Sequence, residues 1–158
     1  MIDLKAMRLE KHLTLHEISQ KSDLAVSQIG RYEKRFEPAN VSLRNVCKIA
    51  KGFDVRIWDL IADEKLKNDL SEVVDIETGF FLDGEISPIA EIKEICDVKQ
   101  NYIAEQSKIP QSQISEWEKY GMDSAKLKHF VILATVLHIN VCLLIWDENL
   151  QNLFCEVL

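Results

Sequence analysis

The sequence predicts an all-α fold of two tandem five-helix units, because one stretch occurs twice and the composition favours helices. Residues 17–34 and 102–119 are identical at 7 of 18 positions, where average residue usage gives roughly one match by chance. Only 5 Gly and 3 Pro occur among 158 residues, and 47% of the residues are hydrophobic, which argues against a turn-rich β fold. The identical pairs are Ile18/Ile103, Ser22/Ser107, Ser27/Ser112, Gln28/Gln113, Ile29/Ile114, Glu33/Glu118 and Lys34/Lys119.

The apolar pattern of the repeat continues on both sides of this stretch, with one residue lost in the second copy. Because mainly apolar residues recur, we expect two similar cores that carry different surfaces. Units of roughly 60 residues are near the lower limit for an independent core, so we expect them to lean on each other or on a partner chain. The corresponding pairs are Leu4/Ile89, Met7/Ile92, Arg8/Lys93, Leu43/Leu127, Val46/Phe130, Ile49/Leu133, Ala50/Ala134, Phe53/Leu137, Val55/Ile139, Leu60/Leu144 and Ile61/Ile145.

The first unit begins with two helices. Residues 3–12 carry apolar side chains at helical spacing. Thr14 is a good N-cap, and Glu17 three residues later completes a capping box. A second helix is therefore predicted over about 15–22.

Three more helices complete the first unit. After a turn at 23–24, a third helix is predicted over about 26–34. Ser42 caps a fourth helix that ends at about Gly52, and a fifth covers about 55–61. The second and third helices with their short turn make a helix-turn-helix.

The repeat divides the chain into a first unit (1–63), an acidic linker (64–87) and a second unit with a C-terminal tail (88–158). Residues 1–63 hold 11 Lys/Arg and 9 Asp/Glu, whereas residues 64–158 hold 8 and 17. Positive charge suits a DNA-binding surface because phosphate contacts dominate affinity. The acidic remainder is explained as well by a need for solubility.

The linker and the tail are predicted in less detail. Residues 64–72 fit a helix, and 73–86 fit either a hairpin or an irregular connection. We expect the apolar residues 80–82 to be buried, between the units. The tail forms an apolar helical stripe that either caps the second core or joins a partner chain. This stripe consists of Leu150, Leu153, Phe154 and Val157.

A specific set of residues accompanies the five predicted helices of the first unit. It consists of Ile18, Leu24, Ile29, Tyr32-Glu33, Pro38, Leu43, Ile49-Ala50 and Phe53-Asp54-Val55. With this set, residues 3–62 resemble the lambda-repressor-like, or Xre-type, helix-turn-helix family, and residues 88–146 resemble it in degraded form. The resemblance implies five-helix domains that insert the third helix into the DNA major groove.

The resemblance also implies which side chains contact DNA. It places Val26, Ser27 and Gln28 where the family reads base edges. The Gln28 amide suits adenine, and Arg31, one turn later, suits guanine or a phosphate. The other residues expected to contact DNA are Arg8, Lys34 and Arg35.

Two further features of the family are found in different units of this chain. The family often pairs a first-helix Arg with a third-helix Glu, and Arg8 and Glu33 lie at those positions. It often has a phosphate-contacting Gln at the start of the second helix, where this chain has Leu15. The second unit does have that residue, Gln100.

The second unit offers a possible second DNA site. Gln111, Ser112 and Gln113 start its third helix, but Glu116 replaces Arg31, and a carboxylate facing DNA is repelled by phosphates. Residues 88–147 have a net charge of −2. Weak DNA binding, protein binding and scaffolding all remain open, and the charge favours a role without DNA.

Other chemistry is poorly supported by the sequence. The four cysteines show no CxxC spacing and are expected to be small buried hydrophobes in a reducing cytoplasm. The four histidines do not predict a metal site, and no cofactor is expected. The N-terminus has no signal-peptide pattern. Residues 130–146 are 17 residues without a formal charge, but polar residues interrupt them. Buried core helices are therefore expected here rather than a transmembrane helix, and no membrane is expected as a partner.

Two functions follow from these observations. The first is a sequence-specific DNA-binding transcriptional regulator, a repressor that occludes promoter DNA as a homodimer. The alternative is a protein-interaction module that uses the same fold, as an antitoxin or anti-repressor would. An enzyme is not expected, because no phosphate loop, metal cluster or nucleophile motif occurs.

Overall fold

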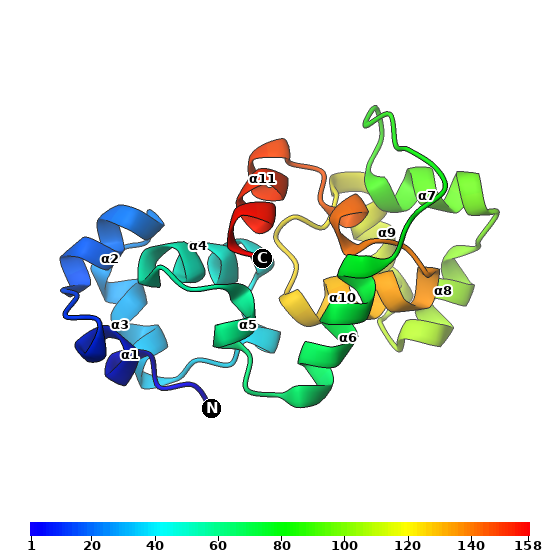
Figure 1. Ribbon diagram of the computed structural model, residues 1–158. Coiled ribbons are helices and arrows are strands. Elements are labelled where there is room, and N and C mark those ends of the chain that lie inside the picture. Colours follow the sequence, from blue (N-terminus) through cyan, green and yellow to red (C-terminus); the bar gives the residue numbers. More distant parts are fainter.

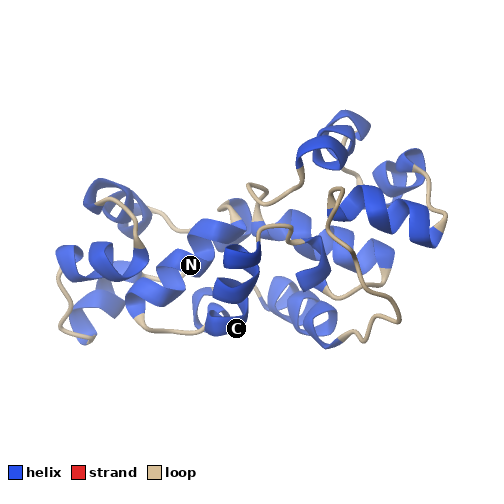
Figure 2. Ribbon diagram, turned by 90° about the horizontal axis from the view of Figure 1, so that it is seen from above, coloured by secondary structure: helices blue, strands red, loops and turns tan.

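The computed structural model describes residues 1–158 and contains eleven α-helices, two short 3₁₀-helices and no β-strand. The predicted all-α fold is therefore confirmed. Figures 1 and 2 show an elongated molecule with the first unit at one end and the second unit at the other. The two units meet in the middle of the molecule.

The first unit contains the predicted helices in the predicted order. The bounds of its second and third helices agree with the prediction, whereas its first and fifth are shorter. The first ends early because His12 adopts a left-handed conformation, with φ 53°. Its elements are α1 (Leu4–Glu10), α2 (Leu15–Ser22), α3 (Val26–Lys34), η1 (Pro38–Asn40), α4 (Leu43–Phe53) and α5 (Ile57–Leu60).

The second unit has helices in the same order as the first. A 3₁₀-helix takes the place of the fifth helix, and residues 130–146 are divided at His138, which has φ 52°. None of the helices in the chain is long and apolar enough to cross a membrane. The elements are α7 (Pro88–Cys96), α8 (Gln100–Ser107), α9 (Gln111–Tyr120), α10 (Leu127–Leu137) and η2 (Val141–Leu144).

Two further helices, α6 (Glu64–Asp75) and α11 (Glu148–Val157), join the units. Helix α6 follows the first unit but packs on α10 and η2 of the second, whereas α11 follows the second unit and packs on α4 of the first. The buried hydrophobic residues of both units consequently form one continuous cluster.

The prediction for the apolar stripe of the C-terminal tail is wrong. Leu150, Phe154 and Val157 are buried and Leu153 is partly buried, all within the chain. The stripe therefore neither caps the second core nor remains free to join a partner chain. It covers α4 of the first unit instead. The apolar pattern alone could not identify that surface.

The connection between α6 and α7 is irregular, as one of the two predictions had it. Glu91 holds this loop by accepting hydrogen bonds from the backbone N–H groups of Asp83, at 2.7 Å, and Gly84, at 3.4 Å. Phe80 and Leu82 are half-buried, but Phe81 is 93% exposed. The predicted burial of the whole apolar run is therefore wrong at Phe81.

The cysteines are less buried than predicted. Cys47 is buried in α4, and burial raises the pKa of its thiol to about 12. Cys142 is half-buried, whereas Cys96 and Cys155 are exposed. The prediction of four buried cysteines is wrong for these two, since both lie near helix ends on outward faces. No group of three or more His, Cys, Asp or Glu residues is placed to hold a metal ion.

Candidate nucleic-acid interface

The helix-turn-helix of the first unit is fixed by close backbone contacts. Asp23 ends α2 in the left-handed conformation, with φ 56°. The hydroxyl of Ser19 donates to the carbonyl of Leu24 at 2.6 Å, and the hydroxyl of Ser22 accepts from the Leu24 N–H at 3.3 Å. Because both hydroxyls bind the residue that follows the turn, α3 leaves α2 in a defined direction.

Helix α2 also lies very close to α4. A Cβ on Gly52 would lie 2.8 Å from the Cβ of Ser22 and 2.9 Å from the side chain of Ile18. Any larger residue at this position of α4 would push α2 away, so glycine allows the two helices to pack together. The core under the helix-turn-helix thereby sets where α3 begins.

An ion pair fixes the other end of α3. Arg8 on α1 donates through Nε to Glu33 on α3 at 2.5 Å and through Nη2 to the same carboxylate at 3.3 Å. The guanidinium also donates to the carbonyl of Leu13 at 3.3 Å. The side chains of Arg8 and Glu33 are only 14% and 9% exposed. The hydrogen bond to Glu33 raises the pKa of Arg8, and this guanidinium is occupied with positioning α3.

The outward face of α3 carries side chains that have no partner within the protein. Val26, Ser27 and Arg31 are exposed, and Gln28 is half-buried. Neither the Gln28 amide nor the Arg31 guanidinium takes part in any side-chain hydrogen bond or ion pair, while the inward-facing Ile29 is 1% exposed. Groups that can donate to base edges are therefore presented on a rigid helix.

The basic residues after Arg31 differ in their surroundings. Lys34 is exposed and forms no ion pair, whereas Arg35 pairs with Glu37 at 2.7 Å. The hydrogen bond from Arg35 holds the pKa of Glu37 below its ordinary value. Lys34 thus offers a free cation at the C-terminal end of α3, and the charge of Arg35 is partly neutralised.

The second unit repeats the positioning contacts of the first with different side chains. Lys93 of α7 pairs with Glu118 of α9, at the positions that correspond to Arg8 and Glu33. Gln100 donates a hydrogen bond to the same carboxylate. Ser107 accepts from the Ile109 N–H at 3.2 Å, as Ser22 does from Leu24.

The predicted second DNA site is brought together by α8 and α9. Gln111 donates to the side-chain oxygen of Gln100 at 3.0 Å, and Gln113 donates to Glu116 at 3.1 Å. Gln111 and Ser112 are exposed, and Gln113 and Gln100 are half-buried. The four side chains thus lie along one region, but all three glutamine amides are already engaged with neighbours.

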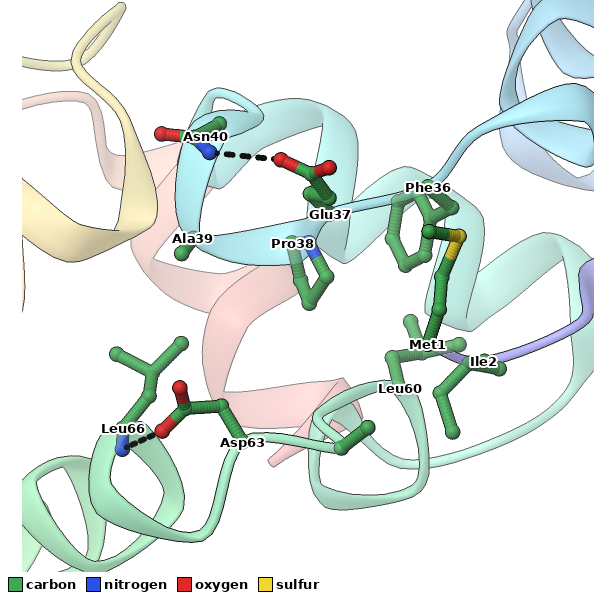
Figure 3. Close-up of a pocket in the computed structure, with 11 residues that line it drawn as sticks. Met1, Ile2, Phe36, Glu37, Pro38, Ala39, Asn40, Leu60, Asp63 and Leu66 are labelled. Atoms are coloured by element: carbon green, nitrogen blue, oxygen red, sulfur yellow. Dashed lines mark hydrogen bonds between the residues drawn. The ribbon is translucent and has the colours of Figure 1, made fainter.

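A pocket of about 440 Å³ lies between the first unit and α6. Apolar side chains such as Phe36 and Leu60 form most of its lining (Figure 3). Its carboxylates are engaged within the protein, since Glu37 accepts from Asn40 at 3.0 Å and Asp63 caps α6. The pocket therefore offers little unpaired polarity to a ligand.

The family model of the helix-turn-helix matches residues 4–57, about a third of the chain. This segment is similar to the helix-turn-helix family, which agrees with the resemblance that the sequence indicated. No curated protein and no solved structure is detectably similar to the chain.

Sequence reasoning missed the pair between Lys93 and Glu118. Arg8 and Lys93 already correspond in the repeat, as do Glu33 and Glu118, so the signal was present in the alignment. It was hidden because Lys replaces Arg and because the pair has no meaning until the two helices are known to pack. The contact shows that both third helices are held in the same way.

Proposed function

We propose that the protein is a sequence-specific transcriptional repressor that occupies promoter DNA through α3 and thereby excludes other proteins. The observation that carries this proposal is the outward face of α3, where Gln28 and Arg31 have no partner in the protein. Their helix is locked by the Arg8–Glu33 pair, at 2.5 Å. Free base-reading groups on a rigid helix are what direct readout of the major groove requires.

The proposal assigns roles to the expected contacts. Ser27 and Gln28 read base edges, Arg31 binds guanine or a phosphate, and Lys34 binds the backbone. Arg8 acts through Glu33 as a positioning residue. No cofactor takes part, because occlusion needs no chemistry, and the protein acts in the cytoplasm, where its DNA target lies.

Selection of bound duplexes from a random DNA pool tests this function directly. The expected result is a defined enriched sequence whose binding is weakened in the Arg31→Ala variant. Lys5→Ala, at an exposed position on α1, is the matched control and should keep the sequence preference. A pool that shows no enrichment would contradict the proposal.

A protein-interaction module is the second candidate, and one observation favours it. Phe81 is 93% exposed on an irregular loop that carries Glu77, Asp83 and Glu85. An isolated exposed aromatic side chain among carboxylates suits a partner with both apolar and basic groups. This function predicts that Phe81→Ser abolishes binding of that protein partner while the thermal stability of the chain stays unchanged.

The assembly that the sequence predicts is a homodimer presenting two copies of the first unit. The apolar stripe assigned to its contact covers α4 within the chain, so a homodimer would have to use another surface.

A further inference from the structure

The two units are joined by a pair of reciprocal backbone hydrogen bonds. Leu43 donates to the carbonyl of Ala125 at 3.0 Å, and Leu127 donates to the carbonyl of Val41 at 3.0 Å. Adding 84 to residues 43 and 41 gives 127 and 125, so each bond is the counterpart of the other in the repeat. Contacts that exchange in this way are the mark of a two-fold axis.

The helices that follow the two units obey the same relation. Residues 63–74 and 147–158 are identical at 6 of 12 positions. Asp63 and Asp147 are the N-caps of α6 and α11, and each helix lies on the fourth helix of the opposite unit. Figure 1 shows α6 and α11 on opposite sides of the junction. The identical pairs are Asp63/Asp147, Glu64/Glu148, Leu66/Leu150, Asn68/Asn152, Glu72/Glu156 and Val73/Val157.

Each unit therefore consists of six helices, and the last one is exchanged with the other unit. This is the arrangement of a two-fold dimer, built within one chain. In the repeat α9 is the counterpart of α3, so the two-fold relation of the junction would pair them as the reading helices of a dimeric helix-turn-helix protein are paired. Such dimers place their two helices on half-sites about one turn of DNA, roughly 34 Å, apart.

The charge of the second helix-turn-helix does not oppose this role. Residues 14–44 contain five Lys/Arg and four Asp/Glu, and the corresponding residues 99–128 contain the same numbers. The acidic excess of the second unit lies in its other helices. Moreover, Glu118 is turned inward by Lys93 and is 18% exposed. Over these segments the net charge is therefore the same in both units, although α9 carries Glu116 where α3 carries Arg31.

The reading chemistry of the two helices is alike at one end and opposite one turn later. Ser27 and Gln28 recur as Ser112 and Gln113, whereas Arg31 is replaced by Glu116, which is exposed. Arginine donates to guanine, whereas a carboxylate accepts from the amino group of cytosine. The two helices consequently prefer different bases at that position.

We propose that one chain binds one DNA site made of two unequal half-sites, with α3 on the first and α9 on the second. The inference rests on the proposed reading of DNA by α3. In this arrangement the two units of one chain take the place of the two subunits of a homodimer. Because the two units differ, the DNA site is asymmetric. The half-sites share the bases read by the Ser-Gln pairs and differ where Arg31 and Glu116 reach.

The test is a DNA selection with the full chain and two variants of equal charge change. Glu116→Arg should make the second half-site resemble the first and should tighten binding to the resulting near-palindrome by roughly tenfold or more. Glu94→Arg, at an exposed position on α7, should leave the selected sequence unchanged.

The outcomes separate this inference from the proposed function. Two unequal half-sites that become similar in Glu116→Arg support it. One half-site only, with the same sequence for all three proteins, overturns the inference and leaves DNA reading by α3 intact. Failure to enrich any sequence overturns the function itself.

Discussion

The first and second units position their third helices in the same way but present different side chains on them. Arg8 and Glu33 fix α3 in the first unit, and Lys93 and Glu118 fix α9 in the second. On the outward faces, the free Arg31 has as its counterpart Glu116, which accepts a bond from Gln113. The comparison teaches that the positioning contacts and the reading surface of this fold vary independently.

The largest expected effect comes from the exchanged helices. Phe154 of α11 and Leu70 of α6 are both fully buried. Replacement by alanine should destabilise the protein by about 3–5 kcal/mol for Phe154 and about 2–5 kcal/mol for Leu70, because each change leaves a cavity. Denaturant unfolding measures these losses.

The location of the damage sharpens the comparison between the units. Hydrogen exchange should show lost protection in α4 for Phe154→Ala and in α10 for Leu70→Ala, because each helix packs on the opposite unit. If protection were lost only in the helix that carries the substitution, the packing of α6 and α11 on the opposite units would be contradicted.

The two ion pairs should contribute similarly to stability. Glu33→Ala and Glu118→Ala each leave a poorly exposed cation without its partner, which should cost about 1.5–3 kcal/mol. The first should cost more, because Glu33 is 9% exposed and Glu118 is 18% exposed. Lys93→Arg keeps the pair and is the control in thermal unfolding. If only Glu33→Ala destabilised the protein, the ion pair of the second unit would not stabilise it as that of the first does.

DNA affinity should distinguish the reading faces. Arg31→Ala should weaken binding to the selected site by about 1–3 kcal/mol, the range for a good base contact. Gln113→Ala should cost less, because the Gln113 amide already donates to Glu116 at 3.1 Å. Fluorescence anisotropy at fixed salt measures both. Equal losses would mean that the two faces contribute equally.

The smallest effect concerns pH and the N-caps of the exchanged helices. The hydrogen bond from Arg44 lowers the pKa of Asp147 below its ordinary value of 3.8, and no such pair involves Asp63. A lowered pKa means that the added stability is present above the ordinary value and is lost as pH falls through the folded-state value. The pair is half-exposed, so it is worth at most about 1 kcal/mol.

Two matched variants isolate this contribution. Asp147→Asn should flatten the acid side of the stability curve more than Asp63→Asn does, because both remove an N-cap carboxylate but only one removes the bond to Arg44. Urea unfolding at several pH values between about 3 and 6 provides the curves. If the free energy of unfolding of the two variants fell identically with decreasing pH, the Arg44 contact would contribute nothing to stability.

The sequence predicted local structure well where a local rule determined it. The capping box at Thr14 fixed the start of α2, and the turn after Ser22 fixed the start of α3. The side chains on the outward face of α3 were assigned by the family resemblance, which places them at the start of this helix. These features depend on residues within one or two turns of each other, so a linear pattern contains them.

Long-range packing was not predicted, because it depends on contacts between distant residues. The stripe from Leu150 to Val157 was recognised as apolar, but its partner α4 lies about a hundred residues earlier. Likewise, Phe81 lies in an apolar run yet is exposed, because Glu91 ties the following residues to α7. The identity between 63–74 and 147–158 was visible but required a search beyond the first five helices.

The number of chains on one selected duplex tests the central claim most directly. Light scattering or native mass spectrometry of the complex, with a footprint of the same duplex, gives stoichiometry and length together. The account predicts one chain per duplex and protection over two half-sites about one helical turn apart. Two chains on the same duplex, each protecting one half-site through its first unit, would contradict it.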